Sequence, residues 1–199
     1  MTAPQTAAGG QRPDIGRDLL ARAEAARRHW RLPAPRHAHL SDVEADAMKH
    51  VDRANTQVLR RIVAEHGWPG RTLVGEEAAR AAWLIALHAD DYEVQKALLR
   101  VLTEAVRQGE ATQAQWAHFF DRCCVQEGRP QIYGTQHRYG PAGIEVLPIH
   151  EPDRLDARRA GVGLPPYAVS SQALHQHHTE PDTDLDAGDT ETPAERGAA

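Results

Sequence analysis

Apolar residues recur at helical spacing over most of the first 128 residues. The first series is Ile15, Leu19, Ala23, Ala26 and Trp30. Steps of three or four positions place side chains on one face of a helix. Pro33 and Pro35 then end the pattern, because proline is tolerated poorly inside a helix. The pattern predicts a first helix over about residues 14–31.

A capping box followed by an apolar stripe predicts a second, longer helix. Ser41 and Glu44 have the residue types and the spacing with which each side chain bonds the other residue's backbone amide. Gly67 and Pro69 supply the stop signal. The helix should be amphipathic and about 25 residues long. Its apolar stripe consists of Val43, Ala47, Val51, Ala54, Val58 and Ile62.

Three further helices should follow at short intervals. Residues 76–88 leave almost no polar face, which is typical of a central, buried helix. Asp91 can cap the next helix, which ends at Gly109. Thr112 and Gln115 form a second capping box and open a fifth helix. The residues expected to face inward from these last two helices are Val94, Leu98, Val101, Leu102, Ala105, Trp116, Phe119, Phe120 and Cys123.

The pattern changes after residue 130. Short β-type runs at 131–133 and 144–147 flank a turn at 139–143, which predicts a small hairpin or an extended clamp. Pro152 can begin a last short helix that extends to Ala160. Glycines and prolines then break regular structure.

The C-terminal tail is acidic and poor in apolar residues. Residues 170–199 hold seven acidic residues and one arginine, a composition that buries too little apolar surface to offset the entropy of ordering. We therefore predict a flexible N-terminus over residues 1–13, a helical domain over 14–168 and a disordered acidic tail over 169–199. The predicted fold class is mainly α: a single compact domain of five to six helices with a small C-terminal β-hairpin or extended clamp.

Charge and cysteine content exclude several classes of protein. The formal charge is −5, and removing the tail's net charge of −6 leaves +1, so the body lacks the basic surface of a general nucleic-acid binder. The adjacent Cys123 and Cys124 do not suit a disulfide framework, which favours the reducing cytoplasm. The longest apolar run, 81–87, is far shorter than the roughly 18 residues of a membrane span. We expect a cytoplasmic protein without nucleic-acid or membrane partners, and the 21 arginines against 2 lysines indicate a GC-rich bacterial genome.

Three residues on the predicted helices are candidates for chemistry. His88 ends the buried helix, where a histidine can be a general base, a ligand or a core residue bonded to a carbonyl. Asp121 and Arg122 interrupt an otherwise apolar segment of the fifth helix. Such a pair either satisfies itself or binds a substrate.

The densest group of polar side chains follows the fifth helix. It consists of Gln131, Tyr133, Thr135, Gln136, His137 and Arg138 around Gly134. Small-molecule sites require converging polar groups of this kind beside apolar walls, and Gly134 permits a tight turn or the close approach of a ligand. A loop that only hydrogen-bonds itself onto the helices would have the same composition. This segment is the best candidate site in the chain.

Common catalytic and cofactor motifs are absent. The sequence has no G-x-S-x-G elbow, no Walker A motif, no G-x-G-x-x-G after a strand and no H-E-x-x-H. The histidines within 175–178 lack a second cluster to complete a coordination shell, so we expect only adventitious metal binding there. We therefore predict no metal and no cofactor.

Several short segments resemble a known family. They are Gly67-Trp68-Pro69-Gly70, Val74-Gly75-Glu76, His88, Asp121-Arg122, Gly128-Arg129-Pro130-Gln131, Tyr133-Gly134-Thr135-Gln136, Asp156-Ala157-Arg158-Arg159 and Gly163-Leu164-Pro165. In these segments the chain resembles a family of uncharacterised bacterial proteins, common in actinobacteria and catalogued as a domain of unknown function. The resemblance spans about residues 50–168. It adds weight to His88, Asp121, Arg122 and the 131–136 segment, and it implies no activity.

The chain departs from that family's pattern at two places. The family has Gln before the histidine, where this chain has Leu87, and an Asp-Gln pair near its first helix, where this chain has Ala25 and Ala26. A site that used those groups would be altered here.

Two classes of function agree with these residues. In the first, the protein is an enzyme or a small-molecule binder in which His88 and Asp121 act as base and orienting acid. The substrate-binding residues would then be Arg122, Gln131, Tyr133, Thr135 and Gln136. In the alternative, the protein is a non-catalytic helical protein-interaction module. The same residues then lock the hairpin onto the helices, and the basic N-terminal arm or the acidic tail contacts a partner. Convergence on one open pocket favours the first class, and dispersal or full burial favours the second.

Overall fold

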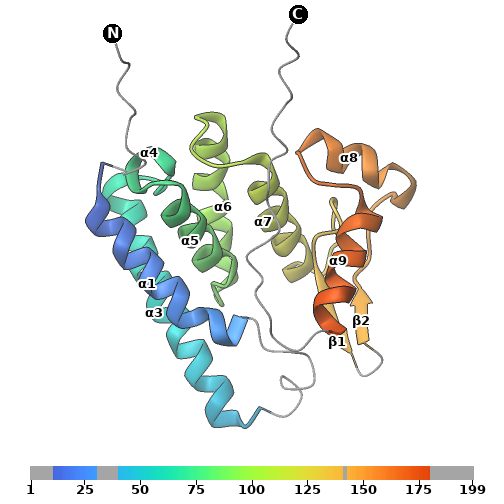
Figure 1. The fold of residues 1–199 in the computed structure, drawn as a ribbon, viewed down its shortest axis with the longest axis horizontal. Coiled ribbons are helices and arrows are strands. Elements are labelled where there is room, and N and C mark those ends of the chain that lie inside the picture. Colours follow the sequence, from blue (N-terminus) through green and yellow to red (C-terminus); the bar gives the residue numbers. More distant parts are fainter. Residues whose placement is uncertain (1–10, 31–39, 141–142, 180–199) are drawn as a thin grey trace, which may run out of the picture.

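The fold is mainly helical, as the sequence predicts. The computed structural model describes residues 11–30, 40–140 and 143–179 (Figure 1). The strands β1 (His137–Gly140) and β2 (Gly143–Val146) form a small antiparallel sheet. No helix in this described part is long and apolar enough to cross a membrane. The helices are α1 (Pro13–Trp30), α3 (Asp42–His66), α4 (Arg71–Val74), α5 (Glu76–Leu87), α6 (Tyr92–Arg107), α7 (Gln113–Gln126), the 3₁₀ helix η1 (Pro152–Arg154), α8 (Leu155–Gly161) and α9 (Tyr167–Thr179).

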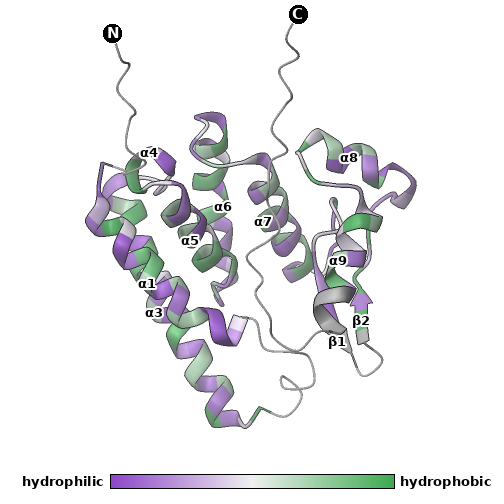
Figure 2. Cartoon of the chain, in the orientation of Figure 1, coloured by the Kyte–Doolittle hydropathy of each residue, from purple (hydrophilic) through white to green (hydrophobic). Residues whose placement is uncertain are grey.

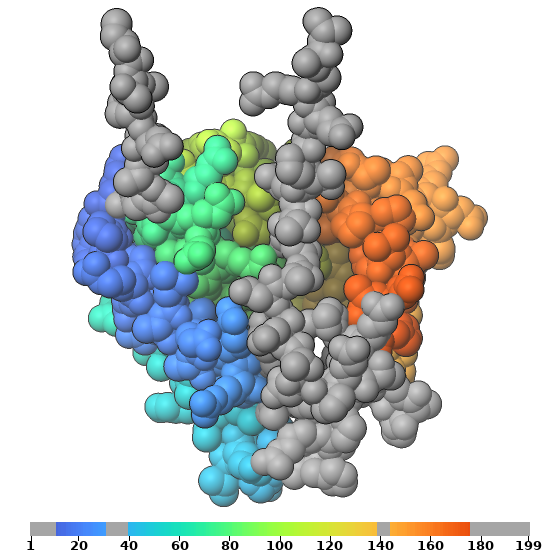
Figure 3. All heavy atoms as spheres, in the orientation of Figure 1, coloured from blue at the N-terminus to red at the C-terminus, as the bar shows by residue number. Residues whose placement is uncertain are grey.

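Helix α5 is the centre of the core, as its apolar sequence predicts. It contacts α1, α3, α4, α6 and α7. Larger side chains from its neighbours, such as Leu19, Leu59 and Leu102, complete the core around it. Figure 3 shows α1, in blue, beside the teal and green α4 and α5, with the orange C-terminal elements on the opposite side. The buried residues of α5 are Ala78, Ala79, Ala81, Ala82, Ile85 and Ala86.

Helix α3 begins at the predicted capping box but turns a different face inward. Ser41 Oγ accepts from the Glu44 N–H (3.3 Å), and Glu44 Oε2 accepts from the Ser41 N–H (2.9 Å). The apolar stripe is exposed over its N-terminal part, because Val43 and Val51 are 79% and 37% exposed, and only its C-terminal end, at Val58 and Ile62, packs against the core. The N-terminal part of α3 extends beyond the helices that cover the rest of it (Figure 1). Purple and green residues alternate along this helix in Figure 2, and its buried residues are Asn55, Thr56, Leu59 and Ile62.

The C-terminal elements differ from the expectation at two points. The run at 131–133 is not a strand, since Gln131 forms only an isolated parallel bridge with Ile149, and the hairpin consists of β1 and β2. Helix α9 occupies residues 167–179, where we expected no regular structure and, from residue 169, a disordered tail. Tertiary contacts hold its start, because the Tyr167 N–H donates to Asp156 Oδ1 (2.7 Å). Residues 1–10 and 180–199 of the two predicted flexible ends lie outside the described residues.

We predict that Gly16→Ala destabilises the fold although alanine is the better helix former. A Cβ atom at Gly16 would lie 2.8 Å from the backbone oxygen of Val74, so α1 or α4 must shift, and overpacking of this kind costs about 1–3 kcal/mol. Gly161→Ala in α8 is the matched control, because a Cβ atom there meets nothing within 4 Å. The control should be neutral or stabilising by up to about 1 kcal/mol. Urea unfolding measures both, and equal effects would contradict the close approach of α1 to α4.

Candidate functional site

Asp121 on α7 binds the backbone of the polar segment that follows the helix. Its side chain is fully buried. Oδ1 accepts from the Ile132 N–H (2.7 Å), and Oδ2 accepts from the Thr135 N–H (3.0 Å) and the Thr135 hydroxyl (2.9 Å). The Tyr133 N–H lies 3.1 Å from both oxygens. Four donors, three backbone amides and one hydroxyl, therefore surround the Asp121 carboxylate. We call Asp121 and residues 131–136 the latch.

The side chains of Gln131 and Gln136 stabilise the latch through hydrogen bonds to main-chain atoms. Gln131 is fully buried, and its Nε2 donates to the carbonyls of Gln136 (2.9 Å) and Leu147 (3.0 Å). Its Oε1 accepts from the Gln136 N–H (2.8 Å). Gln136 Nε2 reaches the carbonyl of His118 on α7 (3.3 Å). Both amides thus bond to main-chain atoms, which is a structural use of these side chains.

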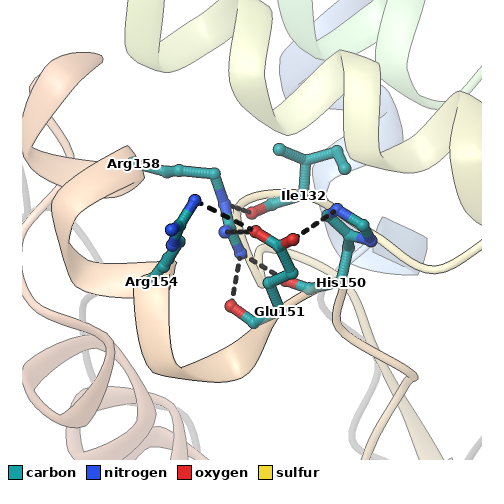
Figure 4. Close-up of polar contacts among 5 residues, drawn as sticks. All are labelled: Ile132, His150, Glu151, Arg154 and Arg158. Atoms are coloured by element: carbon teal, nitrogen blue, oxygen red, sulfur yellow. Dashed lines mark hydrogen bonds and ion pairs between the residues drawn. The ribbon is translucent and has the colours of Figure 1, made fainter.

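Two arginines of α8 bind the outer carbonyls of the latch. Arg158 donates from Nε to the Ile132 carbonyl (2.8 Å) and from Nη2 to the carbonyls of Glu151 (3.1 Å) and His150 (Figure 4). Arg159 is 2% exposed, and its Nη1 donates to the Tyr133 carbonyl (2.6 Å). In the sequence, both arginines belong to a segment that resembles the family, but the sequence does not indicate which groups they bind. Their role becomes visible only when α8 is placed beside the latch.

The turn inside the latch requires glycine and leaves Tyr133 packed against α7. Gly134 has φ 64°, and a Cβ atom there would lie 3.2 Å from the Tyr167 ring. Glycine at this position therefore permits a tight turn and the close approach of the Tyr167 ring. The Tyr133 ring meets Trp116 edge-on, with 6.1 Å between ring centroids, and burial raises the pKa of its phenol.

A separate pocket lies between α1 and α3, at the end of α5. Its volume is about 290 Å³. Trp30 and His88 stack in its wall, with ring centroids 4.4 Å apart and planes inclined by 11°. Burial, together with the positive charges of Arg122 and His29, lowers the pKa of His88 to about 3. His88 is therefore neutral at pH 7. We call this the Asp52 pocket, and it is lined by His29, Trp30, Leu40, Ala45, Met48, Lys49, Asp52 and His88.

Asp52 is the acceptor at the centre of this pocket. Its Oδ1 accepts from Trp30 Nε1 (2.9 Å) and lies 2.9 Å from His29 Nε2. The side chains of Asp52 and His29 are only 16% and 13% exposed. A carboxylate that holds one imidazole nitrogen orients the ring and leaves its other nitrogen for a ligand or a proton.

Arg122 reaches toward the same cluster from α7. Burial lowers the pKa of its guanidinium, whereas Cys123 and Asp52 raise it. Its Nε atom is buried and has no hydrogen-bond acceptor, and no ion pair within the described residues includes Arg122. An arginine remains charged at neutral pH, so this is a half-buried cation whose Nε is buried without an acceptor.

The structure divides the residues singled out from the sequence between two places. Asp121, Gln131, Tyr133, Thr135 and Gln136 belong to the latch. His88 lines the Asp52 pocket, whereas Arg122 does not line it and acts on His88 only through its charge. Among the described residues, no hydrogen bond, ion pair or ring contact joins His88 to Asp121. The donors on Asp121 are backbone amides and the Thr135 hydroxyl, so the carboxylate is not placed to orient His88.

Sequence reasoning missed His29, Trp30 and Asp52. Trp30 fitted the apolar stripe of α1, and Asp52 lay beside the apolar stripe of α3, which proved not to be its buried face. Within the described residues, no group of three His, Cys, Asp or Glu side chains is placed to hold a metal ion. His175 Nδ1 lies 2.6 Å from the Ser171 carbonyl, and the side chains of residues 176–178 lie outside the description.

The fold and the two polar clusters define a class of protein: mainly helical, with a latch that fastens its C-terminal segment and a small polar pocket between its first helices. The chain belongs to the family of unknown function DUF6624, whose family model matches residues 13–178. The match extends beyond the 50–168 resemblance at both ends and includes α1 and most of α9. No curated protein and no solved structure matches the chain.

Asp121→Asn should destabilise the protein by about 3 kcal/mol. The amide would place an NH₂ group against backbone donors in a fully buried position, and unmade bonds to a buried charge are expensive. Asp156→Asn is the control, because Asp156 is exposed and accepts from one amide, and it should cost less than about 1 kcal/mol. Chemical unfolding compares the two. Similar losses would show that the latch does not depend on the Asp121 charge.

Wild-type stability should fall on acidification partly because of His88. The unfolded state takes up a proton near the ordinary histidine pKa of 6.5, whereas the folded state resists it down to about 3. The unfolded state therefore binds more protons below pH 6.5, and folding stability falls as the pH decreases. His88→Phe retains a ring against Trp30 but does not titrate. Between pH 7 and pH 5, this variant should lose roughly 2 kcal/mol less than wild type in urea unfolding. Parallel pH profiles would contradict a neutral, buried His88.

Proposed function

We propose that this protein binds a small polar molecule in the Asp52 pocket. The observation that carries the proposal is Arg122, a half-buried cation without a hydrogen bond at its buried Nε and without an ion pair among the described residues. Its charge contributes to the lowered pKa of His88, and the charge of Asp52 acts to raise the pKa of Arg122. His88 and Asp52 line the pocket, and Arg122 lies outside its lining. A charge buried without a partner opposes folding. Retaining such a charge beside a pocket is typical of a binding site.

The other lining groups support the same function. Trp30 and His88, stacked face to face, form an aromatic part of the lining, and Leu40 and Met48 add apolar surface. A few polar groups among apolar walls are what small-molecule pockets provide. The His29 imidazole, oriented by Asp52, adds a group that can exchange a proton with a bound molecule.

The alternative, a helical protein-interaction module, agrees with the latch but not with the pocket. In that hypothesis the residues of the latch have a structural role, and their bonds to backbone atoms support this. Its partner-binding element was the basic N-terminal arm or the acidic tail. Residues 180–199 of the tail lie outside the described residues, and several arginines of the arm already have acidic partners. The ion pairs are Arg12 with Asp14, Arg22 with Asp18 and Arg27 with Glu24. We therefore assign the latch a structural role and the Asp52 pocket the function.

A thermal-shift screen of polar metabolites tests this proposal. At least one compound should raise the melting temperature of wild type, and Asp52→Asn should abolish most of the shift. This substitution retains an oxygen that accepts from Trp30 and His29, so the fold should persist. Asp18→Asn is the matched control, because Asp18 lines the other hollow between α1 and α3. Shifts that survive Asp52→Asn, or a library without any hit, would contradict the proposal.

A further inference from the structure

The N-terminal half of α3 exposes an apolar face to solvent. Its apolar residues are Val43, Ala47, Val51 and Ala54, of which the two valines are 79% and 37% exposed and the two alanines are also exposed. Figure 3 shows this end of α3, in cyan, projecting at the lower edge of the molecule below the blue α1. Single exposed apolar residues are ordinary on a protein surface, whereas a contiguous apolar patch is typical of an interaction surface.

The four residues form a continuous stripe on the side of α3 that faces away from the core. They recur at steps of four, four and three, which keeps their side chains within about 80° of one another around the helix axis. The buried Thr56 and Leu59 point away from this side, and Asp52 points about 180° away from Val43. The stripe is therefore separate from the Asp52 pocket and independent of the function proposed for it.

Charged residues beside the stripe change sign along the helix. Asp46 precedes the middle of the stripe and Arg53 follows it, and both lie on the same flank because they are about two helix turns apart. Each has a partner on the surface of its own chain: Asp46 Oδ1 lies 3.5 Å from Lys49 Nζ, and Arg53 Nε lies 2.6 Å from Asp90 Oδ2. The side chains of Asp46 and Arg53 nevertheless remain 76% and 64% exposed. A parallel second copy of α3 would bring like charges together, whereas an antiparallel copy brings each acid to a base.

We propose that a second copy of this chain covers the stripe, with the two α3 helices antiparallel about a twofold axis that passes between residues 48 and 49. Such an interface is self-complementary, so every contact occurs twice. One register gives each apolar residue an apolar neighbour and each charge an opposite one. The pairs are Val43 with the partner subunit's Ala54, Ala47 with the partner subunit's Val51, and Asp46 with the partner subunit's Arg53. The contact is small, so the dimer is weak and reversible.

Sedimentation equilibrium of the full chain tests this self-association. Wild type should show a reversible monomer–dimer equilibrium between about 10 µM and 1 mM chain, as expected for a small interface. Ala47→Glu places a charge between the two copies and should weaken the dimer at least tenfold. Ala21→Glu is the matched control, because Ala21 is an exposed residue of α1 outside the stripe, and it should leave the equilibrium unchanged. Equal effects of the two substitutions would contradict the assignment of the stripe.

Charge reversal tests the pairing of the two flanks. Asp46→Arg and Arg53→Asp each bring like charges together twice in the dimer, and each should weaken it at least fivefold. The double variant exchanges the two charges and should restore the wild-type equilibrium. An equimolar mixture of the two single variants should form a heterodimer. A double variant that remains as weak as the single variants would contradict the antiparallel register.

Cysteine cross-linking tests the direction of the two helices. In the proposed register, the two copies of Ala47 lie about 5 Å apart along the helix axis, and the two copies of Val43 lie about 17 Å apart. Ala47→Cys should therefore form a disulfide-linked dimer on mild oxidation, whereas Val43→Cys should not. The native Cys123 and Cys124 are buried and should not cross-link. Equal cross-linking at both positions would contradict the antiparallel arrangement.

The concentration series of wild type decides the proposal even if a variant fails to fold. A chain that remains monomeric up to about 1 mM is inconsistent even with a weak interface of this size. That result would overturn the dimer, whether or not the stripe then binds a different protein.

Discussion

The structure depends on the divergence of two neighbouring residues, Asp121 and Arg122, on α7. Consecutive residues on a helix point about 100° apart, so the two side chains cannot share one partner. The Asp121 carboxylate is buried and bonded to the backbone of the segment that follows the helix. The charge of the Arg122 guanidinium instead contributes to the lowered pKa of His88 at the end of α5, and the charge of Asp52 on α3 acts to raise the pKa of Arg122. Two adjacent residues of α7 thus act on different parts of the molecule: Asp121 on the latch, and Arg122 on His88 in the lining of the pocket.

The C-terminal part of the fold is held mainly by polar contacts. Among the side chains that the structure describes in this part, Leu155 is the one buried apolar residue, whereas Gln131 and Arg159 are buried polar residues. Buried polar residues of this kind fix the relative positions of the segments that they join. A hydrogen bond forms only over a narrow range of distances and angles between donor and acceptor. This explains why the 131–136 segment resembles a binding site in sequence. Its polar groups converge, but on the chain's own backbone.

Sequence patterns predict the helices of this protein better than its sites, for physical reasons. Capping residues such as Ser41 and Thr112 act locally, so their role is readable without a structure. The inward face of α3 depends instead on where α1 and α5 end, and the stripe that includes Val43 lies partly in solvent. Asp52 therefore looked like a surface residue, and its contact with Trp30 joins positions 22 residues apart. The role of Asp121 also required knowing that the chain turns back at Gly134.

The central claim is that Arg122 serves a bound molecule and not the stability of the fold. The most direct measurement is the free energy of unfolding of ligand-free Arg122→Met compared with wild type. Methionine fills much of the same space without a charge, so removing a half-buried guanidinium whose Nε lacks an acceptor should leave the protein at least as stable as wild type. A loss of more than about 2 kcal/mol, the effect expected when a structural partner is removed, would contradict the account.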